Sequence, residues 1–133
     1  MWLLDTNTVS YYFRGQAQVV TRLQALPPAQ VGVPAVVEYE LRYGLARLPV
    51  AAAAPRLAAL QAFLQPLQVL AFDSGCAAQA ARLRAALEAA GTPIGPHDLM
   101  IAATALHYQG VLVTRNVREF SRVPGLQWEN WHG

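Results

Sequence analysis

Three acidic residues of this sequence stand where they could bind a metal ion together. Asp5 directly follows an expected apolar strand, Glu40 lies on the apolar side of an expected helix, and Asp98 falls in the first turn of another. Carboxylates that converge in one pocket repel one another, and a hard cation with oxygen ligands, Mg²⁺ or Mn²⁺, relieves that repulsion. Because such an ion neutralises a phosphodiester and activates water, these residues indicate metal-dependent phosphodiester hydrolysis.

Each of these acids also has an ordinary structural explanation. Aspartate is a preferred helix N-cap, which would explain Asp5, and an acid in a first turn, such as Asp98, interacts favourably with the helix dipole by about 0.3 to 1 kcal/mol. Glu40 could be held inside the protein by backbone donors or by an arginine. The sequence leaves both explanations open for each residue taken singly.

Two further glutamates are assigned to the scaffold. Glu38 has Arg42 four residues later, the favourable order for a solvent-facing ion pair. Asn116 and Glu119 have the spacing of a capping box, with Asn116 as the N-cap of a short helix and Glu119 reaching back to it. We therefore expect Glu38 at the surface and Glu119 at a helix start.

The positive charge of the chain is carried entirely by arginine, with ten arginines, no lysine and a net charge of +2. Arg115, Arg118 and Arg122 follow one another at helical spacing and could form one basic stripe beside the site, suited to phosphates of RNA. A solvated helix face is the alternative explanation. Fixed positive charge permits nucleic-acid binding without demonstrating it.

The composition excludes several classes of protein. With 54 % apolar and 14 % charged residues, the 133 residues predict one folded domain, 1–133, and exclude a disordered chain. No apolar run has the roughly 20 residues of a membrane span, and the N-terminus lacks the pattern of a secretory signal. These features predict a cytoplasmic protein without membrane association. A single cysteine, Cys76, and no closely spaced histidines argue against a zinc site and against nucleophilic catalysis.

Short apolar strands alternate with longer helices along the chain. The expected strands are 3–4, 31–33, 69–72, 111–113 and 126–128, and the expected helices are 9–13, 34–48, 55 to near 66, 74–90, 97–108 and 117–120. Such alternation favours crossover connections and a parallel sheet covered on both faces. The predicted fold is α/β, a three-layer α/β/α sandwich with a central, mostly parallel sheet whose carboxyl strand ends carry the site.

Four segments resemble, in order and over essentially the whole chain, the motifs of PIN-domain ribonucleases of the VapC toxin type. They are LDTN at 4–7, VEYELRYG at 37–44, HDLMIAA at 97–103, and VTRNVREF at 113–120 followed by VPGL at 123–126. The resemblance implies a PIN-like fold and a metal-dependent endoribonuclease that is toxic when free. It further implies a cognate antitoxin that holds the enzyme inactive, and a homodimer of toxins.

The resemblance also assigns roles to individual residues. The first, second and third acids of the family correspond to Asp5, Glu40 and Asp98, with Mg²⁺ as the implied cofactor. Asp5 and Asp98 would bind the ion directly, and Glu40 would be a further ligand or would orient water, leaving a 5′-phosphate and a 3′-hydroxyl. The implied supporting residues are Thr6, Asn7, Thr114 and Asn116. Because Asn116 stands where PIN domains often have Asp, the implied arrangement is one tightly held Mg²⁺ and a second that arrives with the RNA.

Two other functions remain open at this level. One is a catalytically silent PIN-like module that binds RNA or protein. The other is a different metal-dependent phosphohydrolase with a nucleophile at Asp5, although such enzymes usually have a second acid two residues later, where this chain has Asn7.

The number of aromatic residues is larger than one hydrophobic core needs. This surplus predicts a homodimer interface and a groove for an antitoxin segment. The aromatic residues concerned are Tyr11, Tyr12, Phe13, Tyr39 and Tyr43.

Overall fold

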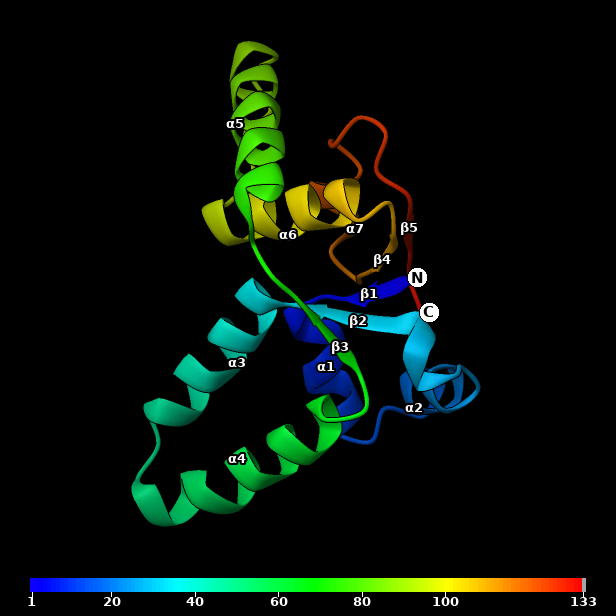
Figure 1. The fold of residues 1–133 in the computed structure, drawn as a ribbon, viewed down its shortest axis with the longest axis vertical. Helices are drawn as coiled ribbons and strands as arrows, with labels where there is room; N and C mark the ends of the chain where they lie inside the picture. The colour runs from blue at the N-terminus through cyan, green and yellow to red at the C-terminus, as the bar shows by residue number, and fades with distance from the viewer. Residues whose placement is uncertain (133) are drawn as a thin grey trace.

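A five-stranded parallel sheet forms the centre of the protein in a computed structural model that describes residues 1–132 (Figure 1). The strands are β1 (Trp2–Leu4), β2 (Val31–Pro34), β3 (Gln68–Leu70), β4 (Val111–Val113) and β5 (Trp128–Glu129), in the order β3-β2-β1-β4-β5. Leu3 of β1 pairs with Gly32 on one side and with Leu112 on the other. The predicted α/β fold is confirmed, and all four strand pairings are parallel.

Helices cover both faces of the sheet, as the sequence predicts. The helices are α1 (Thr6–Phe13), α2 (Ala17–Gln24), α3 (Ala35–Ala46), α4 (Val50–Leu64), α5 (Ser74–Ala89), α6 (Pro96–His107) and α7 (Val117–Phe120), with a 3₁₀ turn at Pro28–Gln30. Figure 1 shows α5, α6 and α7 on one side of the sheet and α1 and α2 on the other, while α3 and α4 form a hairpin that projects from the body. Apolar strand residues such as Leu4, Leu112 and Val113 are fully buried between these layers.

Several predicted boundaries shift by one to three residues, since α1 begins at Thr6, β3 ends at Leu70 and β5 begins at Trp128. The larger corrections concern two helices. The helix α2 was not expected, because its N-cap is Gln16, whose side chain accepts a hydrogen bond from the Val19 N–H at 2.9 Å, and glutamine is not among the usual capping residues. The helix α4 begins at Val50, so Pro55 lies inside it and does not open it. A run of four alanines at 51–54 carries the helix up to the proline, because alanine is the best helix former.

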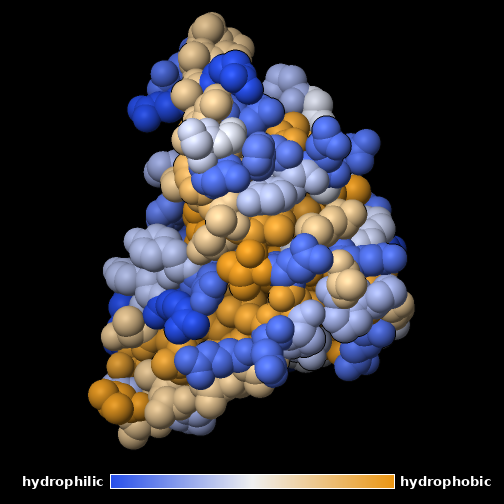
Figure 2. Space-filling view, in the orientation of Figure 1, coloured by the Kyte–Doolittle hydropathy of each residue, from blue (hydrophilic) through white to orange (hydrophobic). Residues whose placement is uncertain are grey.

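The surface combines apolar and hydrophilic areas. Figure 2 shows an apolar band across the middle of one face, bordered by hydrophilic side chains. Large exposed apolar side chains occur on α1 and α3, where Phe13, Tyr39 and Tyr43 are 45 %, 55 % and 56 % exposed. Within residues 1–132, no helix has both the length and the apolar character that crossing a membrane requires.

Candidate active site

The three predicted acids meet in one small cavity where strands β1 and β4 end. Asp5 follows β1, Glu40 comes from the middle of α3, and Asp98 comes from the first turn of α6. The cavity has a volume of about 130 Å³, and its lining consists of Asp5, Thr6, Asn7, Glu40, Asp98, Ile101 and Asn116. Carboxyl ends of parallel strands meet at one edge of a sheet, which is why residues far apart in sequence converge there.

Asp5 has both of the roles that the sequence left open. Its Oδ1 caps α1 by accepting a hydrogen bond from the Thr8 N–H at 2.8 Å, and the residue also lines the cavity. Asp5 is only 4 % exposed, and this burial raises the pKa of its carboxyl group, while hydrogen bonds from Thr114 and Thr8 oppose the rise. The buried hydroxyl of Thr114 thus supports the site from the end of β4.

Glu40 connects three helices. Its Oε1 accepts a hydrogen bond from the Thr6 hydroxyl of α1 at 2.6 Å, and its Oε2 lies 3.1 Å from Nδ1 of His97 on α6. The partners of Glu40 are therefore a hydroxyl and an imidazole, and not the backbone donors or arginine of the structural explanation. His97 was not among the predicted site residues, although its position directly before Asp98 was a usable signal.

Glu38 gives a useful comparison with Glu40 on the same helix. Its predicted ion pair with Arg42 is confirmed at 2.7 Å. The side chains of Glu38 and Glu40 are 23 % and 25 % exposed, so the expected contrast between a surface Glu38 and an inward Glu40 does not appear in their exposed fractions. The direction in which each side chain leaves the helix, and not its depth, decides which one reaches the cavity.

Asp98 carries the clearest sign of crowded negative charge. Burial, a hydrogen bond with Glu119, and the charges of Glu119, Asp5 and Glu40 raise the pKa of Asp98 to about 8. A carboxyl group that holds its proton at neutral pH has no charge with which to stabilise the helix dipole of α6. The dipole therefore does not explain why this position is an acid.

Asn116 is the N-cap residue of α7, as predicted, but the hydrogen bonds of the predicted capping box with Glu119 are not formed. The Asn116 side chain makes no capping bond, and its backbone N–H instead donates to Thr114 Oγ1 at 2.9 Å. Glu119 reaches across to α6, where Oε1 accepts from the Gly95 N–H at 2.8 Å, and the Asn116 amide donates to Glu119 Oε2 at 2.9 Å and to Asp98 Oδ2 at 3.3 Å. Glu119 is therefore a fourth carboxylate beside the cavity, which its capping-box spacing did not predict.

The three predicted RNA-contacting arginines do not form a stripe along one helix. The helix α7 spans only Val117–Phe120, so Arg115 and Arg122 lie outside it. The Arg115 guanidinium donates to the Tyr11 hydroxyl at 3.2 Å, and that of Arg122 donates to the Pro93 carbonyl at 2.9 Å. Arg118 is exposed. Contact of these arginines with RNA stays a prediction.

The donor set of the cavity fits a hard divalent cation. The ligand groups that line it are carboxylates of Asp5, Glu40 and Asp98 together with amides of Asn7 and Asn116, with no cysteine or histidine in the lining. Oxygen-only sites of this kind suit Mg²⁺ or Mn²⁺ and not zinc. Burial is the main cause of the raised pKa of both Asp5 and Asp98, and the neighbouring carboxylates add to it, so a bound cation would favour the ionised form of both groups.

Comparison with known proteins identifies the family. Residues 2–126 match the PIN domain. The chain belongs to the PIN-domain family. The tRNA(fMet)-specific endonuclease VapC of Salmonella typhimurium is 34 % identical over 132 residues, which cover 98 % of this chain and 97 % of that protein. Ribonuclease VapC2 of Rickettsia felis is 32 % identical over 133 residues, covering 98 % of both. The resemblance to VapC-type PIN domains is therefore confirmed, and with it a ribonuclease fold.

Solved structures of similar fold include DNA-bound VapBC proteins. The DNA-bound VapBC of Salmonella typhimurium has a chain that superposes with a TM-score of 0.90 at 34 % identity, covering 98 % of this PIN domain and 97 % of that chain. FitAcB from Neisseria gonorrhoeae superposes with a TM-score of 0.88 at 32 % identity over the full length of both chains. VapBC2 of Rickettsia felis, bound to a promoter DNA fragment, gives 0.89 at 31 % identity.

Proposed function

We propose that this PIN domain is a Mg²⁺-dependent endoribonuclease and the toxin of a toxin–antitoxin pair. The observation that carries the proposal is the cavity that gathers Asp5, Glu40 and Asp98 at the carboxyl end of the sheet. Glu119, next to Asp98, adds a fourth carboxylate. Curated relatives of similar length bear ribonuclease names, which supports RNA as the substrate.

In this proposal Asp5 and Asp98 hold Mg²⁺, for which Mn²⁺ can substitute, and Glu40 and Glu119 complete its surroundings. An ion held by these residues would supply positive charge to the scissile phosphodiester and would make water a better nucleophile. Asp98 gives up its proton to bind the ion, because a protonated carboxyl group is a poor ligand.

The other site residues orient the reactants. Thr6 fixes one oxygen of Glu40, which leaves the oxygen beside His97 to orient the attacking water. Water loses a proton and adds to phosphorus while the bond from phosphorus to the 3′-oxygen breaks. The 3′-oxygen then takes up a proton. The products are a 5′-phosphate and a 3′-hydroxyl. Asn7 and Thr114 support the acids, and Asn116 holds Asp98 and Glu119 at fixed positions.

An antitoxin segment would occupy the groove between α1, α3 and α4. This groove has a volume of about 750 Å³, and both Thr6 and Glu40 of the active site belong to its lining. A peptide in the groove can therefore bring a basic side chain to the acids and displace the metal ion. The exposed Phe13, Tyr39 and Tyr43 offer further apolar area for the antitoxin and for a second toxin copy.

The test of nuclease activity uses the protein purified free of antitoxin, with transfer RNA as the first substrate because a relative is named for it. Cleavage should require Mg²⁺ or Mn²⁺ and stop in excess EDTA. Glu40→Gln should lower the cleavage rate by about a hundredfold or more, since outer ligands of metal sites alone are worth 10- to 100-fold. Glu38→Gln is the matched control and should cleave like the wild type.

Other outcomes would support the alternatives. Cleavage that persists in EDTA, or equal losses in the two glutamine variants, would contradict the metal mechanism. Metal binding and RNA binding without cleavage would favour the catalytically silent module. Release of phosphate from a small phosphomonoester, with RNA left intact, would favour another phosphohydrolase.

Glu119→Gln should weaken both Mg²⁺ affinity and cleavage by about tenfold or more. The amide cannot supply the negative charge that Glu119 places beside Asp98. Glu88→Gln is a suitable control, because Glu88 pairs with Arg84 on the solvent-facing side of α5. Calorimetric Mg²⁺ titration together with initial cleavage rates would measure the effect. An unchanged Mg²⁺ affinity in Glu119→Gln would return Glu119 to a structural role at the start of α6.

A further inference from the structure

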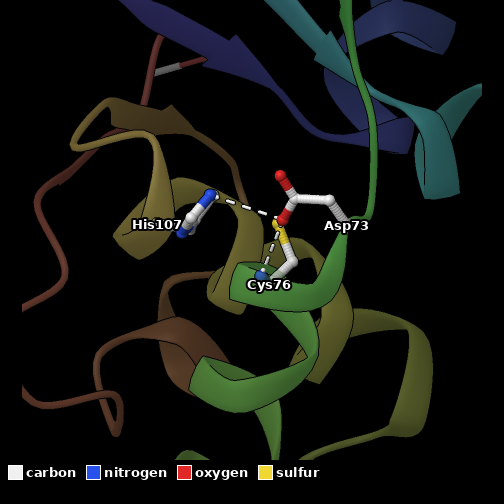
Figure 3. Close-up of side chains that lie close together, drawn as sticks. All are labelled: Asp73, Cys76 and His107. Atoms are coloured by element: carbon white, nitrogen blue, oxygen red, sulfur yellow. Dashed lines mark hydrogen bonds and ion pairs between the residues drawn. The ribbon is translucent and has the colours of Figure 1, made fainter.

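A second group of metal-ligating side chains lies at the opposite end of α6 from Asp98. Asp73 is the N-cap of α5, Cys76 lies in the first turn of α5, and His107 lies in the last turn of α6. Figure 3 shows the three side chains pointing toward one another. One ligand atom from each residue, a carboxylate oxygen, a sulfur and a ring nitrogen, lies within 4.8 Å of the other two.

The distances are close to those of a tetrahedral zinc site. Zinc bonds of about 2.0–2.3 Å at tetrahedral angles place neighbouring ligand atoms about 3.3 to 3.6 Å apart. Nε2 of His107 already lies 3.4 Å from Oδ1 of Asp73. The Cys76 sulfur lies within 4.8 Å of a ligand atom of each of these two side chains, so small rotations of the side chains would bring the three ligand atoms toward the spacing of a zinc site.

The residues around the cluster allow His107 to lie close to the start of α5 and hold that helix start in place. A Cβ atom at Gly75 would lie 2.1 Å from Cε1 of His107, so the imidazole reaches this position because residue 75 has no side chain. The Ala71 carbonyl accepts from the Cys76 thiol at 3.6 Å and from the Tyr108 hydroxyl at 2.9 Å, which fixes the backbone before α5.

The cluster is also open to solvent on one side. The side chains of His107 and Asp73 are 32 % and 50 % exposed, while Cys76 is fully buried beneath them. An ion can thus enter from solvent, bind the three side chains and keep a fourth position for water. Burial raises the pKa of the Cys76 thiol, which argues against a free thiolate nucleophile at this place.

We propose that Asp73, Cys76 and His107 form a second metal site, separate from the nuclease cavity, which takes Zn²⁺ or another borderline cation such as Co²⁺. Mixed sulfur, nitrogen and oxygen ligands select zinc over Mg²⁺, the reverse of the preference of the carboxylate cavity. On binding, the Cys76 thiol releases its proton to solvent. The ion ties the start of α5 to the end of α6, the helix whose first turn carries Asp98.

The test is a cobalt titration of the full-length, metal-free protein. We expect a thiolate-to-cobalt charge-transfer absorption that saturates at one equivalent, persists in excess Mg²⁺ and disappears when Zn²⁺ is added. Cys76→Ser and His107→Gln should each lose the absorption, whereas Asp98→Asn should keep it. Zn²⁺ should raise the melting temperature of the wild type and not that of Cys76→Ser, and Cys76→Ser should still cleave RNA with Mg²⁺.

Two results would overturn the site. One is the absence of a charge-transfer absorption in the wild type, and the other is an absorption of unchanged strength in His107→Gln, which would mean that Cys76 binds cobalt alone. Circular dichroism checks that each variant is folded. If Cys76→Ser does not fold, the partly exposed His107 position decides the question by itself.

Discussion

Asp98→Asn should abolish Mg²⁺-dependent RNA cleavage and should not destabilise the metal-free protein. The cleavage rate should fall by more than about a hundredfold, because even outer-shell partners of a metal site are worth 10- to 100-fold. Wild-type protein should also gain thermal stability from Mg²⁺, since an ion that binds only the folded state stabilises it by RT ln(1 + [L]/Kd), and the variant should lose most of this gain. Melting curves with Mg²⁺ and with EDTA, read beside cleavage rates, measure both effects.

The pH dependence of the metal-free protein distinguishes a metal-binding role of Asp98 from an interaction with the dipole of α6. The pKa of Asp98 is about 8 in the folded protein and starts from 3.8. Between these values the folded state holds a proton that the unfolded state has lost, so stability falls as the pH rises from about 4 to about 8. Asp98→Asn should remove this contribution and be the more stable protein at pH 8. A variant that is less stable at every pH, yet still cleaves RNA, would mean that Asp98 serves mainly to stabilise the first turn of α6.

Phe120→Ala should cost about 3 to 5 kcal/mol of unfolding free energy, the usual range for a large aromatic residue in a core. Phe120 is fully buried and is the largest of the completely buried side chains. It ends the four-residue helix α7, which is too short to be stable without such an anchor, and it directly follows Glu119. Urea unfolding in EDTA measures the loss, and Mg²⁺ affinity should fall as well because Glu119 loses its support.

Ser121→Ala is the neighbouring control for Phe120→Ala. Ser121 is exposed and its hydroxyl donates only to the Arg118 carbonyl at 3.3 Å, so the change should stay within about 0.5 kcal/mol. Similar losses of stability in the two variants would mean that α7 is held by its backbone and not by the buried ring.

The layers of the fold and the three central acids could be predicted from the sequence because local signals coincide there. Apolar residues recur with clear periodicity in α3 and α6, and a short apolar strand precedes Asp5. Parallel strands then place their carboxyl ends at one edge of the sheet. The ends of individual helices were harder to predict from the sequence. The start of α4 depends on four alanines that outweigh Pro55, and α2 depends on an unusual glutamine cap.

The parts of the site that the sequence did not reveal depend on contacts across the fold. Glu119 has the spacing of a capping residue, and only the position of α6 brings the Gly95 N–H and Asp98 to it. Cys76 and His107 similarly lack the short spacing of familiar zinc motifs, and the packing of α5 on α6 brings them together. Local spacing cannot distinguish such residues from caps or from isolated side chains.

The gathering of four of the eight acidic residues in and beside one cavity also shapes the electric field of the protein. The other four, Glu38, Asp73, Glu88 and Glu129, each lie within ion-pair distance of a basic side chain, whereas among the four acids at the cavity only Glu40 does so within residues 1–132, through His97. Without a cation, the carboxylates that stay ionised beside the protonated Asp98 give the cavity a negative potential that repels RNA phosphates, although the arginines make the net charge of the protein positive. A divalent ion reverses the local sign, so RNA is attracted to the point it would otherwise avoid. Metal concentration should thus control the association rate of RNA as well as its cleavage, and this control should weaken as salt shortens the Debye length from about 10 Å at 0.1 M to about 3 Å at 1 M.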